Sequence, residues 1–189
     1  MAWSEAVDGW ARGRWWQWRV PLLCLLAWDA KRHLADPGAG GLFSGITFGT
    51  HELGHLLFAP FGEVLTVAGG SINQLLIPVL TGLLFVYYTD YFGIAVAGTW
   101  LASSLLDLAR YIGDARTLDL DLVGFGENSI HDWAWLLGHF RILQYDTRIA
   151  AFTRGVAVLV LLCSLGLGVW LCVRMWALPR DSGGEGAPS

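Results

Sequence analysis

The chain has 189 residues, with a hydrophobic fraction of 54%, a charged fraction of 15% and a mean hydropathy of +0.49. These values exclude an ordinary soluble globule and indicate a membrane protein, while the length leaves room for one small helix bundle. The formal net charge of −4 lacks the basic excess that nucleic-acid binding requires. We therefore expect an all-α, multi-pass transmembrane helix bundle that contacts membrane lipid and binds no nucleic acid.

The first twenty residues combine tryptophans with arginines. Indole rings favour the headgroup level of a bilayer, so this pattern predicts an N-terminal interfacial helix. The apolar stretch at residues 21–28 is short for a membrane span, which leaves open whether residues 20–35 cross the bilayer. Residues 36–41 read Asp-Pro-Gly-Ala-Gly-Gly and predict a break in the helical structure.

Four further hydrophobic segments follow, separated by turn-forming residues. They are residues 42–59, 75–88, 92–108 and 156–173. Pro60 and Gly62 end the first of them, and the weak alternation over residues 63–70 predicts a short hairpin or re-entrant stretch. With residues 20–35 counted as undecided, the sequence predicts about four or five membrane segments.

Residues 109–154 are more polar, and no stretch among them is long enough to span a membrane. The arginines of this region and its border are Arg110, Arg116, Arg141, Arg148 and Arg154. Basic loops lie mostly on the cytoplasmic side, so we expect this region there. The final residues, 179–189, are rich in Gly, Ser and Pro and predict a disordered tail.

The most specific motif of the chain is His51-Glu52-Leu53-Gly54-His55, an HExxH pattern within the hydrophobic segment 42–59. Residues four apart lie on one face of an α-helix, so both imidazoles can bind one ion. Imidazole nitrogen is a good zinc ligand, and a glutamate between the two histidines can take a proton from water at the metal. The motif predicts a Zn²⁺ site with His51 and His55 as ligands and Glu52 as the catalytic base.

Residues 42–109 resemble the site-2 protease family of intramembrane zinc metalloproteases. That family has HExxH on a first core helix, a Gly- and Asn-containing start on a second, and an aspartate zinc ligand on a third. Residues 69–74, Gly-Gly-Ser-Ile-Asn-Gln, are similar to the second element, and Asp107 falls at the third, followed by Leu108 where the family has Gly. The resemblance implies a single membrane-embedded metallopeptidase-like domain over residues 1–178.

A catalytic zinc usually has three protein ligands and one open position, so the motif needs a third ligand. The resemblance and its position at a helix end favour Asp107. Chemistry favours His131, because imidazole is a common zinc ligand and Asp132 beside it adds polarity. We predict His131 as the third ligand and Asp107 as the alternative.

Two amide side chains lie near the start of the second core segment. Asn73 and Gln74 are candidates for positioning a substrate strand or for donating to a developing oxyanion. The alternative is that they only hydrogen-bond between helices. Because the motif segment and the segment ending near Asp107 reach the same membrane face as residues 109–154, we expect the metal site toward the cytoplasmic face.

These features predict an intramembrane zinc metalloprotease that cleaves a transmembrane or juxtamembrane polypeptide at a locally unwound segment. One alternative is a non-catalytic membrane subunit of a larger complex, with a partner in the membrane and a structural or relic metal site. Another is a metal-dependent hydrolase of a lipid or a different amide. Glu52 favours an enzyme, because a structural site needs the two histidines and not the carboxylate between them.

Overall fold

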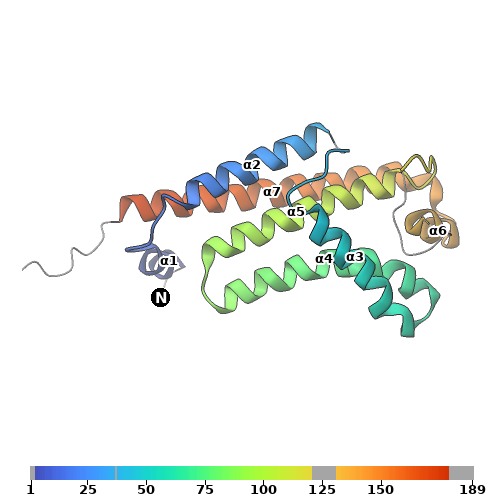
Figure 1. Ribbon diagram of the computed structural model, residues 1–189, viewed down its shortest axis with the longest axis horizontal. Coiled ribbons are helices and arrows are strands. Elements are labelled where there is room, and N and C mark those ends of the chain that lie inside the picture. Colours follow the sequence, from blue (N-terminus) through green and yellow to red (C-terminus); the bar gives the residue numbers. More distant parts are fainter. Residues whose placement is uncertain (1–2, 37, 121–130, 179–189) are drawn as a thin grey trace, which may run out of the picture.

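The computed structural model describes residues 3–36, 38–120 and 131–178, and within these ranges it is helical without β-strands (Figure 1). The α-helices are α1 (Trp3–Ala11), α2 (Arg19–Ala35), α3 (Ser44–Phe58), α4 (Glu63–Tyr87), α5 (Tyr91–Gly113), α6 (Asp132–His139) and α7 (Asp146–Ala177). Two short 3₁₀ turns, Ala59–Phe61 and Leu143–Tyr145, connect α3 to α4 and α6 to α7. The predicted all-α class is therefore confirmed. The predicted tail at residues 179–189 lies outside the described residues.

Three helices are long and apolar enough to cross a membrane, namely α4, α5 and Leu143–Ala177, which contains α7. α2 and α3, with 17 and 15 residues, are shorter than the ~20 residues that a span normally needs. The described residues thus support a membrane-associated bundle with fewer candidate spans than the predicted four or five. α5 is the most buried of the three and lies between α4 and α7 (Figure 1).

The prediction of a hairpin or re-entrant stretch at residues 63–70 was wrong, because α4 begins at Glu63 and continues through this region. Gly62 has φ +97° and breaks the preceding turn, after which the helix starts at once. The glycines that weaken helix propensity here allow close packing against α3. A Cβ at Gly54 would lie 2.2 Å from the Gly69 carbonyl oxygen, and one at Gly69 would lie 2.7 Å from that of Gly54. Tertiary contact therefore outweighs local propensity.

The sequence predicts a break between α2 and α3, and residues 38–43 of this connection are held by hydrogen bonds. The Asp29 carboxylate of α2 accepts the Leu42 backbone N–H at 3.0 Å, and the Gly41 N–H donates to Ser44 Oγ at 2.6 Å. Because Asp29 is buried, these bonds hold the loop against α2 and the start of α3. The loop consequently lies beside the motif helix and forms part of the site described below.

Candidate metal centre

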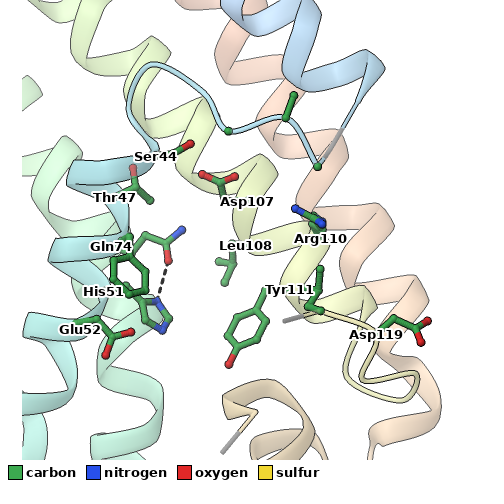
Figure 2. Close-up of a pocket in the computed structure, with 15 residues that line it drawn as sticks. Ser44, Thr47, His51, Glu52, Gln74, Asp107, Leu108, Arg110, Tyr111 and Asp119 are labelled. Carbon is green, nitrogen blue, oxygen red and sulfur yellow. Dashed lines mark hydrogen bonds between the residues drawn. The ribbon is translucent and has the colours of Figure 1, made fainter. Parts of the chain in front are cut away.

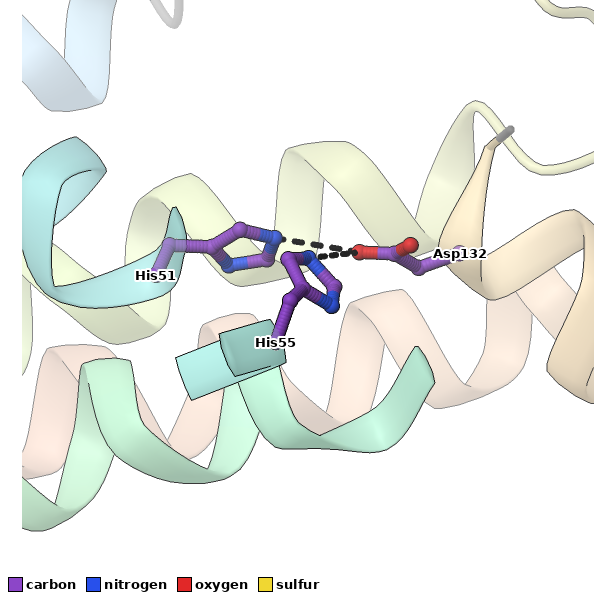
Figure 3. Close-up of side chains that lie close together, drawn as sticks. All are labelled: His51, His55 and Asp132. Atoms are coloured by element: carbon purple, nitrogen blue, oxygen red, sulfur yellow. Dashed lines mark hydrogen bonds and ion pairs between the residues drawn. The ribbon is translucent and has the colours of Figure 1, made fainter. Parts of the chain in front are cut away.

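The HExxH residues lie on α3, and both histidines present Nε2 to the same carboxylate. His51 Nε2 is 3.0 Å and His55 Nε2 is 3.2 Å from Oδ2 of Asp132, at the start of α6 (Figure 3). One ligand atom from each of these three residues lies within 4.8 Å of the other two. The helical spacing of four residues produces the histidine pair, and folding brings the carboxylate to it from a residue far along the chain.

The other ring nitrogen of each histidine is held by a hydrogen bond that defines its tautomer. His55 Nδ1 lies 2.9 Å from the Thr66 carbonyl oxygen, which can only accept. His51 Nδ1 lies 2.9 Å from Oε1 of Gln74, whose amide NH₂ donates to the Ser104 carbonyl at 2.9 Å. Both Nδ1 atoms therefore donate, so a neutral ring directs its Nε2 lone pair at Asp132. Such outer hydrogen bonds are typical of histidines that ligate a metal.

Gly70 of α4 lies directly beside the two imidazoles. A Cβ at this position would be 2.6 Å from Nε2 of His51 and 2.6 Å from Nε2 of His55. Because residue 70 is a glycine, no side chain occupies the space beside the Nε2 atoms of His51 and His55. The close packing of Gly54 on Gly69 brings this part of α4 near the histidines. Two imidazole nitrogens and one carboxylate oxygen that converge in this way fit a Zn²⁺ ion, which binds nitrogen at about 2.0–2.1 Å.

Asp132 is positioned by the bundle and not by its own short helix alone. Its backbone N–H donates to the Tyr111 hydroxyl of α5 at 2.9 Å, and Trp133 Nε1 donates to Ser71 Oγ of α4 at 3.0 Å. Nδ1 of His131 accepts the Ala134 N–H at 3.1 Å and caps α6. The first two bonds attach the first turn of α6 to two membrane-length helices and the third caps it, so the carboxylate has a defined position.

The structure does not bring the two predicted third ligands to the histidine pair. His131 is buried as the N-cap of α6, and its Nε2 lies 3.3 Å from Asp114 Oδ2 without the alignment of a hydrogen bond. Asp107 instead pairs with His33 of α2, with 2.9 Å between Nε2 and Oδ1. The residue in the third position is Asp132, the immediate neighbour of the predicted His131. The sequence analysis treated Asp132 only as a source of local polarity.

Asn73 and Gln74 occur as buried amides that link helices. Asn73 Nδ2 donates to the Thr50 carbonyl of α3 at 2.6 Å, while Gln74 joins His51 to α5 as described above. Gln74 also lines the cavity beside the site, but both ends of its amide are already hydrogen-bonded. In this arrangement the two amides support the motif helix, which is the interhelical alternative that the sequence left open.

A cavity of about 510 Å³ opens beside the histidine pair, between α3, α5 and the α2–α3 loop (Figure 2). Glu52 lines it together with His51 and Tyr111. The Glu52 carboxylate is half-buried and makes no hydrogen bond to another described residue. A carboxylate without a structural partner, beside two convergent imidazoles and within a cavity, has the surroundings that a general base requires.

Asp132 and His55 shift each other's pKa in the directions that favour an ion pair. Burial alone would raise the pKa of the Asp132 carboxyl, but hydrogen bonds from His51 and His55 lower it below its ordinary value. The hydrogen bond to Asp132 raises the pKa of His55 to about 9, against the opposing effect of burial. Without metal, His55 is therefore a cation at neutral pH and pairs with an ionised Asp132.

This pairing predicts that metal affinity increases with pH. A metal ion needs neutral imidazole, so below pH 9 binding must first displace a proton from His55. We expect the apparent affinity for Zn²⁺ to rise about tenfold per pH unit between pH 7 and about 9, and then to level off. Chelator-buffered zinc titrations of the detergent-purified protein across this range measure the slope. An affinity independent of pH would show that the proton on His55 does not compete with the ion.

Substituting Gly70 tests the packing of the site. In Gly70→Ala the new methyl group would lie against both Nε2 atoms, so we expect zinc content to fall at least tenfold. Gly45→Ala on α3 is a matched control, because a Cβ there meets nothing within 4 Å. Elemental analysis of both variants after chelator-free purification makes the comparison. Full zinc occupancy in Gly70→Ala would place any bound ion elsewhere.

Comparisons of this chain with models of known protein families, with curated proteins and with solved structures find no match.

Proposed function

We propose that this chain is a zinc-dependent peptidase of the membrane, a divergent relative of the site-2 protease family, with Zn²⁺ held by His51, His55 and Asp132. The observation that carries the proposal is the direction of the two Nε2 lone pairs. Both point at one oxygen of Asp132 because both Nδ1 atoms donate elsewhere. One divalent cation would satisfy all three ligand atoms together.

A zinc ion held there supplies the positive charge that acidifies water to a pKa of about 7 and polarises a carbonyl. Glu52 removes the proton from the attacking water and returns it to the leaving amine, so the cleavage consumes one water and yields an acid and an amine. His51 and His55 are kept in the ligating tautomer by Gln74 and the Thr66 carbonyl.

The substrate we propose is a transmembrane or juxtamembrane polypeptide. The cavity lies against α5, one of the three membrane-length helices, and α4 forms the other side of the histidine pair. A peptide bond within an intact helix is hydrogen-bonded and inaccessible, so the substrate must unwind locally to reach Glu52. The arginines of residues 109–154 support a site toward the cytoplasmic face of a multi-pass protein.

The test of this function combines metal analysis with a cleavage assay. The detergent-purified chain is expected to contain about one zinc per molecule, which His51→Ala loses. Zinc-loaded protein is then incubated with a set of synthetic transmembrane peptides, and products are identified by mass spectrometry. Cleavage that stops after chelation and returns with zinc supports the proposal. A wild-type chain that takes up no zinc would refute it.

A second candidate is a non-catalytic membrane subunit of a larger complex, and one observation favours it. With His55 charged, the ion pair to Asp132 already joins α3 to α6 without metal. A subunit with a relic site would bind no zinc, and one with a structural site would bind zinc but cleave no peptide. The metal analysis and the cleavage assay above together separate the two functions.

A further inference from the structure

Asp107, which the resemblance assigns to zinc, occupies a different part of the cavity. Its carboxylate Oδ1 lies 2.9 Å from Nε2 of His33. The side chain of His33 is 3% exposed, whereas that of Asp107 is 30% exposed and lines the cavity. Figure 2 shows Asp107 between α5 and the start of α3, on the same cavity as His51 and Glu52. One end of the carboxylate is thus anchored and the side chain remains accessible.

The anchor is built from buried groups. Ser103 Oγ lies 3.4 Å from His33 Nδ1, so the serine hydroxyl can donate to that nitrogen while Nε2 faces Asp107. Asp29, one turn before His33 on α2, is also buried and is occupied by the Leu42 N–H. This arrangement holds Asp107 beside a buried histidine, with its side chain on the cavity wall.

The charges that face the cavity favour a positively charged ligand. Its walls carry three carboxylates, Glu52, Asp107 and Asp119, and one guanidinium, Arg110. Glu52 belongs to the metal centre, and Asp119 is exposed at the margin, where solvent weakens a single charge. Asp107 is the partly buried carboxylate, and a charge-assisted hydrogen bond to it is correspondingly strong.

We infer that Asp107 is a specificity-determining residue, and that the cavity binds a lysine or arginine side chain of the substrate beside the bond to be cleaved. The inference rests on the proposed function, since it defines the substrate of that same site. Asp107 lies one helical turn, about 6 Å, before Tyr111 on α5. The Tyr111 ring centroid is 6.0 Å from that of His51, so a long cationic side chain extending from the metal centre can reach the carboxylate.

The experiment compares two zinc-binding probes, Nα-acetyl-lysine hydroxamate and Nα-acetyl-norleucine hydroxamate. They share the hydroxamate and the four-carbon stem, and differ in the ammonium group. Isothermal titration calorimetry on the zinc-loaded wild-type protein is expected to show the lysine probe binding at least tenfold more tightly. In Asp107→Asn the difference is expected to disappear. Asp119→Asn is the matched control, and its preference for lysine should stay within about twofold of the wild type.

The outcomes separate this inference from the proposed function. Equal binding of both probes to the wild-type protein, or a lysine preference that survives Asp107→Asn, would overturn the role of Asp107 and leave the metal centre intact. Failure of the wild-type protein to bind either probe would refute the metal centre, and the inference with it. His33→Ala adds a positioning test, because a carboxylate that has lost its anchor should retain only part of the preference.

Discussion

Asp132→Ala is expected to abolish zinc binding, with the apparent affinity falling by at least about 100-fold. The reason is direct, since Asp132 Oδ2 is the only described carboxylate oxygen grouped with the two histidine nitrogens. Losing a ligand costs more than losing an outer hydrogen bond, which already lowers metal affinity by about 10–100-fold. Zinc per chain, measured by elemental analysis after chelator-free purification, provides the readout.

Three further variants make this result specific. Asp132→Asn keeps the size of the side chain and controls for packing, and we expect it to lose most of the zinc as well. His131→Ala removes the cap of α6 and costs about 1 kcal/mol of stability, but it should retain about one zinc per chain. Asp107→Asn should retain zinc too. If Asp132→Ala retained zinc and His131→Ala or Asp107→Asn lost it, the third ligand would be His131 or Asp107, as the sequence predicts.

Glu52→Gln is expected to eliminate peptide cleavage while leaving the metal in place. Glutamine has nearly the same shape, but its amide cannot accept the proton of the attacking water. General-base catalysis typically contributes about 10²–10⁴-fold, so the rate should fall by that factor. The measurement is the initial rate of cleavage of a transmembrane peptide by zinc-loaded protein, with zinc content determined on the same sample.

Glu63→Gln is a useful control, since it removes an exposed carboxylate from the first turn of α4. We expect its cleavage rate to stay within about twofold of the wild type. Unchanged cleavage in Glu52→Gln, with zinc bound, would mean that another group takes the proton. A loss of zinc in the same variant would mean that Glu52 supports the site and does not act in the reaction.

Much of this protein follows from local sequence. The hydrophobic segments predict helices, and the breakers at residues 36–41 and at Gly62 mark real helix boundaries. The histidine pair is equally local, because a spacing of four residues on one helix places two side chains together whatever the rest of the fold does. Where the sequence analysis was wrong about residues 63–70, a weak alternation of polar and apolar residues misled it, because the segment is the helical start of α4 and its glycines lie in the contact with α3.

The third position of the metal centre could not be determined in this way. His131 and Asp132 are adjacent in sequence and equally plausible as ligands, and the direction in which each points depends on the start of α6. His131 turns inward as the helix cap, while the backbone N–H of Asp132 is held by Tyr111 of α5. The second of these contacts joins residues 21 positions apart, to which no local pattern is sensitive.

The sequence by itself determined the helical class and the apolar character, and it predicted two ligands and a base, since each depends on composition or on the period of one helix. Only the tertiary structure brings Asp132 to the two histidines and Gly70 beside them. It also pairs Asp107 with His33 on the wall of the cavity. The physical reason is that a metal centre needs several ligand atoms within a few ångströms. When those atoms come from distant segments, the packing of helices, here α4 and α5 against α3 and α6, sets the distance.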